Sequence, residues 1–313
     1  GEIQTNLCSG FPGLSVHYAG ANGPAWPYSD EATAGVERQV MKDMRVAAMF
    51  YYRTNRKQIG TRNLAVPSSA YTPFQFTVPN GPGGSVANPQ PVAVTVYNLN
   101  PAFNGLQNSV IDNQDYLDTN YKGVDLTAQK RLSNKWQMVA GLTFGVNRGG
   151  INAIEGQRAT ISAANGGDLN DPNFTQYSNG VVGNDSPVAF RLSGSYELPY
   201  KIGIAGTLVS NSGYPYISTY SLSRATAAAA GINLTRATQT VLLSNRGDER
   251  LPSVTLIDLR LSRSFTFGNR RIQPQLDIYN LTNQYSAQST TVGVGTTYLR
   301  PTSILSPRIM RVG

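Results

Sequence analysis

Apolar and polar residues alternate with a period of two through several long stretches of the chain. In the stretch 121–131, Val124 and Leu126 fall on one face. Asp125 and Thr127 fall on the other. The same alternation runs through 136–146, 188–198 and 257–267. Because successive side chains of a β-strand point to opposite faces, the pattern predicts strands with one apolar and one polar face.

Short turns join these stretches in pairs. Residues such as Asn, Gly, Asp and Pro separate neighbouring stretches by only a few positions, which is typical of β-hairpins. The pattern predicts four hairpins: 31–39 with 45–53, 121–131 with 136–146, 188–198 with 202–211, and 257–267 with 272–280. A ninth strand is predicted to begin near Arg308. Pro274 removes a ladder hydrogen bond inside the eighth strand and predicts a bulge there.

Long polar connections separate the hairpins and the ninth strand. They are rich in Gly, Asn, Ser, Thr and Pro and cover 54–120, 147–187, 212–253 and 281–306. Within them, extra strands are predicted at 71–78 and 92–98 and a helical turn at 226–231. Because short turns and long connections alternate, we expect all short turns at one end of the sheet and all long connections at the other.

This arrangement favours a transmembrane β-barrel over a soluble β-sheet. Ten alternating residues at about 3.3 Å each, tilted by about 40°, cover roughly 25 Å, the height of the apolar band of an outer-membrane barrel. Aromatic residues gather beside the short turns, where a barrel has an interfacial girdle: Trp136, Tyr196, Tyr200, Phe265 and Phe267. The predicted fold class is all-β, an antiparallel transmembrane barrel segment of about 8–10 long strands. A soluble sheet whose apolar face packs on a core would explain the alternation, but not the length of the strands or the sorting of short turns and long connections.

Composition excludes several other classes of protein. The mean hydropathy is -0.27 and no apolar run reaches about 18 residues, which excludes a helical membrane protein. The net charge of +8 comes from scattered basic residues rather than from a patch, so we expect no nucleic-acid binding. Cys8 and His17 are the only residues of their kinds, which leaves no intramolecular disulfide and no zinc site. We expect no enzyme, no cofactor and no metal, and interpret the oxygen-rich segment 168–173 as a solvated turn rather than a calcium loop.

Two sets of side chains are candidates for binding. Charged residues on the polar face would line the lumen of a barrel, although cross-strand ion pairs that support the wall are the interpretation we favour. They are Asp125, Arg191, Glu197, Asp258 and Arg260. The second set mixes charged and aromatic residues in the connection 147–187, as surface recognition of a polar or peptide-like ligand requires. It comprises Arg148, Arg158, Asp168, Asp171, Phe174 and Tyr177.

Short motifs follow one another along the predicted strands in a defined order. They are YSDE at 28–31, GVER at 35–38, YKGVDL at 121–126, FRLSGSYELP at 190–199, DLRLSRSF at 258–265 and DIYNLTN at 277–283. In this order and spacing the chain, from about Tyr28 to Gly313, resembles the C-terminal part of the barrel of TonB-dependent outer-membrane receptors. The resemblance is closest to the long-loop receptors that carry an N-terminal carboxypeptidase-regulatory-like domain.

The resemblance implies a bacterial outer-membrane location and active transport. Receptors of this family have a barrel of about 22 strands around an N-terminal plug, through which a periplasmic TonB-type energiser drives import. The sequence contains no plug, TonB box, regulatory-like domain or closing aromatic residue. We therefore expect an irregular lead-in or extracellular loop at 1–30 and a C-terminal barrel portion at 31–313. The implied partners are outer-membrane lipid, the energiser and a substrate; the alternative function is a passive porin-like or structural, adhesive barrel.

Overall fold

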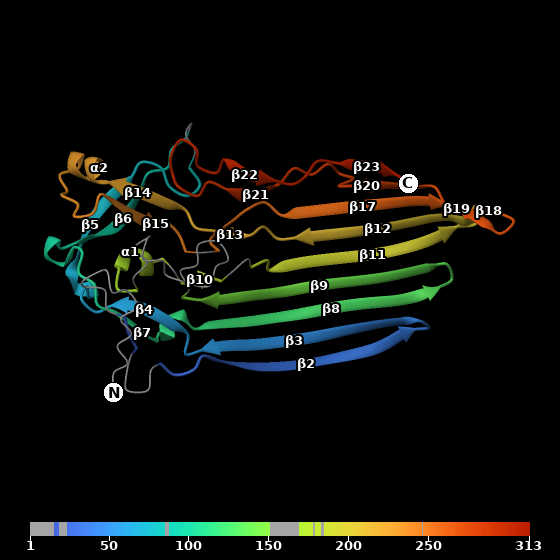
Figure 1. Cartoon of the computed structure of the whole chain (residues 1–313), viewed down its shortest axis with the longest axis horizontal. Helices are drawn as coiled ribbons and strands as arrows, with labels where there is room; N and C mark the ends of the chain where they lie inside the picture. Colours follow the sequence, from blue (N-terminus) through green and yellow to red (C-terminus); the bar gives the residue numbers. More distant parts are fainter. Residues whose placement is uncertain are drawn as a thin grey trace.

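One large antiparallel sheet dominates the structure, a computed structural model that describes residues 16–18, 24–84, 88–150, 169–177, 179–182, 185–245 and 247–313 (Figure 1). In this part of the chain the sheet has ten strands, in the order β2-β3-β8-β9-β11-β12-β17-β20-β23, with β10 paired to β9. Its strands are β2 (Tyr28–Met41), β3 (Met44–Arg56), β8 (Thr119–Ser133), β9 (Trp136–Gly149), β10 (Gly180–Val181), β11 (Val188–Leu198), β12 (Ile202–Asn211), β17 (Val254–Arg263), β20 (Gln275–Tyr279) and β23 (Ile309–Val312). The predicted all-β, antiparallel class is confirmed.

The predicted hairpins and the ninth strand are present. β2 pairs with β3, β8 with β9, β11 with β12 and β17 with β20, and β23 pairs with β20 at the edge. In the β8–β9 turn, Asn134 and Lys135 both have positive φ, 51° and 68°. Positive φ at both central residues is typical of a type I′ turn, whose twist matches that of the strands it joins. The short turns lie together at one end of the sheet and the long connections at the other, as the sequence predicts (Figure 1).

Pro274 interrupts the fourth hairpin without forming a bulge. Beyond the last β17–β20 pair, Ser262 with Gln275, pairing resumes between β18 (Phe265–Phe267) and β19 (Arg270–Ile272). The register is the same on both sides of the gap, so no extra residue is inserted. The carbonyl of Pro274 still accepts a hydrogen bond from the amide of Arg263, at 3.2 Å. The predicted bulge is wrong because the proline only removes a donor, which the ladder tolerates as a local gap.

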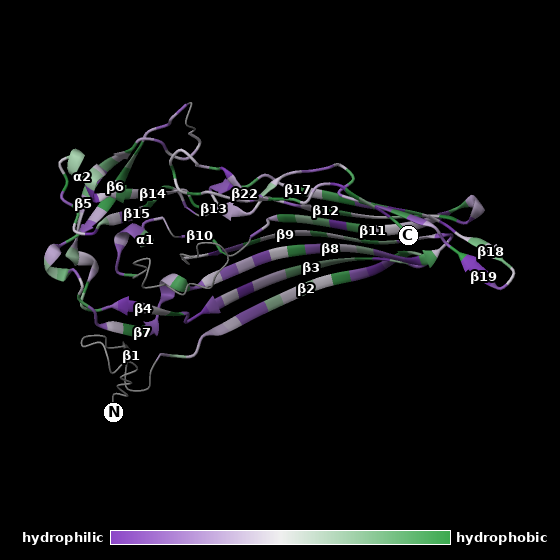
Figure 2. Cartoon of the chain, turned by 45° about the horizontal axis from the view of Figure 1, so that its top comes forward, coloured by the Kyte–Doolittle hydropathy of each residue, from purple (hydrophilic) through white to green (hydrophobic). Residues whose placement is uncertain are grey.

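The register keeps an apolar and a polar face separate across the sheet. One row of directly paired residues crosses six strands: Val46, Ala128, Ala140, Leu192, Leu208 and Ile257. Polar residues pair in the same way on the other face, for example Asp125 with Thr143 and Thr207 with Asp258. A slip of one residue at any pair would transfer a strand's apolar side chains to the polar face, so a single register satisfies all strands. Figure 2 shows the resulting alternation of hydrophobic and hydrophilic bands along the strands.

The buried hydrophobic core lies in the long connections rather than in the sheet. The predicted extra strands form the hairpin β5 (Tyr71–Val78) and β6 (Val92–Leu99), and the predicted helical turn is α2 (Arg224–Ala229). Side chains of β5 and β6 pack against α2 and against the hairpin of β14 (Thr219–Ser223) and β15 (Thr238–Leu242). Their fully buried residues are Val78, Val96, Leu222, Ala227 and Val241. The first and third long connections therefore fold as one unit.

Smaller elements complete the end that carries the long connections. They are β1 (Val16–Tyr18), β4 (Ile59–Asn63), β7 (Ser109–Asn113), α1 (Pro172–Thr175), β13 (Pro215–Tyr216), β16 (Glu249–Arg250), β21 (Ala287–Thr290) and β22 (Pro301–Ile304). His17 lies in β1, whose backbone runs parallel to β7, and Cys8 lies outside the described residues. No helix in the described ranges is long and apolar enough to cross a membrane.

The packing of the connections leads to a stability prediction. Leu222 has no exposed surface, so Leu222→Ala should remove about 2–5 kcal/mol from the local free energy of unfolding. Hydrogen exchange of the β5 and β6 amides, which lie in another connection, measures this loss. Leu106→Ala, at a position that is half exposed, is the control and should change exchange little. Unchanged exchange in the Leu222→Ala variant would show that the two connections unfold independently.

Candidate functional site

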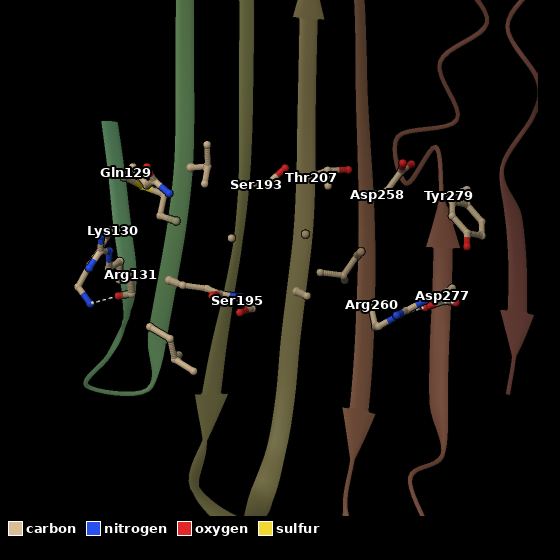
Figure 3. A pocket seen from close by; sticks show the side chains of 18 residues that line it. Gln129, Lys130, Arg131, Ser193, Ser195, Thr207, Asp258, Arg260, Asp277 and Tyr279 are labelled. Carbon is tan, nitrogen blue, oxygen red and sulfur yellow. Dashed lines mark hydrogen bonds and ion pairs between the residues drawn. The ribbon is translucent and has the colours of Figure 1, made fainter. Parts of the chain in front are cut away.

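A groove crosses the polar face of the sheet towards the short turns (Figure 3). Its volume is about 660 Å³, and it is lined by residues of β8, β9, β11, β12, β17 and β20. The register brings the polar side chains together, because Gln137 pairs with Ser195 and Thr207 pairs with both Ser193 and Asp258. These side chains offer hydrogen-bond donors and acceptors to a polar solute or to another segment of protein.

An ion pair closes one side of the groove. Arg260 in β17 lies directly across from Asp277 in β20 and donates from Nε at 2.5 Å and from Nη2 at 2.9 Å to its two carboxylate oxygens. The side chain of Asp277 is 5% exposed, whereas that of Arg260 is half exposed. A bidentate pair of this kind fixes the geometry of both side chains. For Arg260 the favoured interpretation of a cross-strand ion pair agrees with the structure.

The other four charged residues predicted on the polar face differ in their surroundings. Asp258 accepts a hydrogen bond from the amide of Asn280 at 2.8 Å and lines the groove. Oδ1 of Asp125 is buried and has no hydrogen-bond partner in the described part of the chain. Arg191 and Glu197 are exposed on β11. Arg191 is paired in the ladder with Gly141 and Val209, and Glu197 is paired with Gly203. Their contact with a plug or a solute stays a prediction.

Asp171 joins three of the long connections. It precedes α1 in the second connection, where its Oδ1 accepts from the backbone and side-chain amides of Asn173 at 3.0 and 2.8 Å. Its Oδ2 accepts from Arg236 of the third connection at 2.7 Å. Arg236 also donates to the hydroxyl of Tyr71 in the first connection, at 3.2 Å. Burial lowers the pKa of Arg236, but Asp171 and Tyr71 outweigh it and hold that pKa above its ordinary value.

Asn173 extends this junction with an amide pair to the backbone. Its side chain accepts from the amide of Tyr97 at 2.9 Å and donates to the carbonyl of the same residue at 2.8 Å. Asn173 therefore takes the place of a neighbouring strand at β6. Buried backbone groups need such partners, because leaving them unpaired costs about 1–3 kcal/mol each.

Two further carboxylates add contacts between connections, and one of them brings in the fourth. Asp185 of the second connection accepts from Arg250 of the third at 2.6 Å. Glu249 accepts from Ser218 and Ser244 at 2.5 and 2.9 Å and from the hydroxyl of Tyr298, in the fourth connection, at 3.3 Å. Burial raises the pKa of Tyr298, and the nearby Glu249 carboxylate adds to this rise, against the lowering effect of the hydrogen bond with Ser218. Together with Asp171, these carboxylates tie all four long connections into one assembly.

The structure corrects part of the predicted recognition surface. Asp171 and Phe174 were expected on the surface of the second connection, but both are buried, Asp171 by its ion pair and Phe174 within the packed connections. Arg148 is exposed at the end of β9 and Tyr177 is half-buried after α1, so their role in recognition stays a prediction. Arg158 and Asp168 lie outside the described residues.

Sequence reasoning missed several residues of the groove. Asp277 and Tyr279 line it, as do Gln129, Ser193, Ser195 and Thr207. The alternation of apolar and polar residues identifies them, because each lies at a position of its strand that points to the polar face. The choice of five charged residues passed over the uncharged residues of the groove and also over Asp277, which is charged. In the described ranges, no three or more His, Cys, Asp or Glu side chains form a group that could hold a metal ion.

The buried ion pair yields a second prediction. Arg236→Met leaves the fully buried Asp171 carboxylate without its cation, which should cost about 3–5 kcal/mol in the local stability of the connections. The double variant Asp171→Asn/Arg236→Met keeps an oxygen for Asn173 and removes the uncompensated charge, so it should recover much of that loss. Hydrogen exchange at Tyr97 and in α1 measures both effects. Equal protection in the wild type and in Arg236→Met would contradict the role of the pair.

The chain is similar to solved outer-membrane proteins, although no protein-family model and no curated protein matches its sequence. The ferripyoverdine receptor of the Pseudomonas aeruginosa outer membrane is 11% identical, with a TM-score of 0.47, over 91% of this chain and 26% of the receptor. The outer membrane transporter YddB from Escherichia coli is 15% identical, with a TM-score of 0.49, over 96% of this chain and 34% of the transporter. The siderophore receptor PirA from Acinetobacter baumannii is 8% identical, with a TM-score of 0.45, over 96% and 32%. The chain thus spans between a quarter and about a third of the length of these proteins.

Proposed function

We propose that this chain forms part of the wall of a bacterial outer-membrane receptor, which captures a solute with its long connections and imports it actively. The observation that carries the proposal is the apolar face of the sheet, which stays exposed in the described part of the chain. Large apolar side chains on it include Val36, Phe50, Leu126, Phe144, Met310 and Val312. A contiguous apolar face of this kind marks contact with a membrane or a protein. Strands with a lipid-facing and a lumen-facing side are typical of outer-membrane barrels.

Two cation–aromatic pairs on this face support the membrane placement. Lys122 lies over the ring of Tyr52 at 5.8 Å, and Lys130 lies over the ring of Trp136 at 4.1 Å. The two lysines are on the same face of β8, separated by apolar residues, and lie about 26 Å apart along the strand at about 3.3 Å per residue. Aromatic and basic side chains are enriched at the two membrane–water interfaces. With the strands tilted by about 40°, the two pairs lie roughly 20 Å apart along the membrane normal, somewhat less than the apolar band of about 25 Å.

The arrangement of the connections supports a receptor. Loops on a rigid scaffold can carry recognition without disturbing the wall. Here ion pairs and hydrogen bonds join the connections, which present one folded surface at one end of the sheet. Active import rests on the resemblance of the strand motifs to TonB-dependent receptors, with the energiser acting through a plug outside this chain. A plug with a TonB motif in the full-length protein would support active import, whereas a protein made of strands alone would favour a passive barrel.

The two faces of β9 provide a matched test of the membrane placement. Leu142→Arg places a charge on the apolar face and should hinder assembly, because Arg near the midplane of a barrel costs about 2–4 kcal/mol. Thr143→Arg places the same charge on the polar face, across from Asp125, and should assemble almost normally. The measurement is the heat-modifiable gel migration of the full-length protein in outer-membrane fractions. Equal yields of the two variants would overturn the assignment of the faces.

Orientation is tested with epitope tags in exposed turns. A tag after Gly231, in the third connection, should be labelled on intact cells, because the long connections are proposed to face outwards. A tag at Asn134, in the β8–β9 turn, should be labelled only after the outer membrane is opened. Labelling of the Asn134 tag alone on intact cells would reverse the orientation.

A further inference from the structure

A hollow of about 430 Å³ lies over β2, β3, β8, β9 and β11. It opens where three alanines on the apolar face, Ala48, Ala128 and Ala140, stand in place of larger residues. Larger apolar side chains border it: Val36, Val46, Leu126, Leu142 and Phe190. Its volume falls in the range of small-molecule sites, about 300–1,000 Å³. The hollow is thus large enough for a segment of a hydrocarbon chain.

A cation borders this hollow. Arg38 lines it and belongs to the same cross-strand row as Val46, Ala128 and Ala140. Arg38 is exposed and has no ion pair or side-chain hydrogen bond within the part of the chain that the structure describes. By contrast, the arginines of the opposite face on β3 are paired: Arg45 with Glu37, and Arg53 with Glu31. An unpaired guanidinium beside an apolar surface is complementary to an anionic group attached to an apolar chain.

The height of Arg38 along the strand fits the membrane interface. Arg38 lies three residues before the end of β2 at Met41, about 10 Å from the short turn at about 3.3 Å per residue. On the same face, Lys130 also lies near the turn, but it is buried and donates to the carbonyls of Ser133 and Trp136 at 2.9 and 3.1 Å. Arg38 is exposed, and long exposed basic side chains near the end of a membrane segment extend to the headgroup level.

We infer that the hollow and Arg38 form a binding site for one anionic phospholipid of the leaflet on the short-turn side. An acyl chain would occupy the hollow over the three alanines. The phosphate would accept from the Arg38 guanidinium, which can donate two parallel hydrogen bonds to it. The inference rests on the proposed membrane placement of the apolar face. It adds a specific lipid site to that placement, which by itself requires only general contact with lipid.

The test measures lipid retention by the full-length protein, extracted in detergent, using native mass spectrometry. The probes are phosphatidylglycerol and the zwitterionic phosphatidylcholine, supplied at equal concentrations. The wild type should retain phosphatidylglycerol preferentially. Arg38→Gln should reduce that retention about five-fold, the effect of one basic residue at an anionic lipid surface. Ala128→Leu fills the hollow and should reduce retention of both lipids.

Matched controls separate the site from general charge and bulk. Arg270→Gln removes an exposed charge beside the β18–β19 turn, and Ala34→Leu enlarges an exposed side chain of β2 that does not line the hollow. Both should retain phosphatidylglycerol as the wild type does. Heat-modifiable migration verifies that each variant is folded, and the comparison uses only variants that pass.

Three outcomes would overturn the lipid site while leaving the membrane placement intact. Equal retention of phosphatidylglycerol by the wild type, Arg38→Gln and Ala128→Leu would exclude the site. Equal retention of the two lipids by the wild type would exclude the role of charge. A detergent-dependent, heat-modifiable protein that retains no phosphatidylglycerol would also exclude the site. By contrast, a full-length protein that is recovered without detergent would overturn the proposed function together with the lipid site.

Discussion

The strand register is the constraint on which the rest of the structure depends. From β2 to β23, the strands are paired so that their apolar positions share one face of the sheet. Because the side-chain period is two, a shift of one residue in a single pair would place polar side chains in the apolar row. The same register assembles the polar groove on the other face. Even Pro274, which breaks the ladder, leaves this register unchanged.

The two ends of the sheet are built on different physical principles. At the short-turn end, tight turns with positive φ set the pairing, and Lys130 and Trp136 join strand to turn. At the other end, the connections make their own hydrophobic core and are joined by carboxylates whose partners come from other connections. Such buried ion pairs contribute specificity more than net stability, because desolvation offsets much of the attraction. They fix which connections lie side by side.

The apolar face and the polar face complement one another in function. If the apolar face contacts lipid, the polar groove faces the interior of the barrel, and the folded connections lie at one of its two mouths. The unpaired Oδ1 of Asp125 and the exposed Arg191 and Glu197 then offer contacts in that interior. Arg260 is already held by Asp277, so its contribution there is to the wall.

The sequence by itself determined the strands and the hairpins. It also determined that short turns and long connections lie at opposite ends of the sheet, and on which face each side chain of a strand lies. These features follow from local alternation and turn chemistry. It also located β5, β6 and α2 inside the long connections. Tertiary structure alone decided that Asp171 and Phe174 are buried, since partners of this junction, such as Arg236 and Tyr97, lie 65 and more positions away in other connections. It also decided that Asp277 pairs with Arg260 and that three alanines on neighbouring strands meet in one hollow beside Arg38. Alternation gives the face on which a side chain lies, whereas the neighbour it meets there depends on the register between strands and on the packing of connections that are distant in sequence.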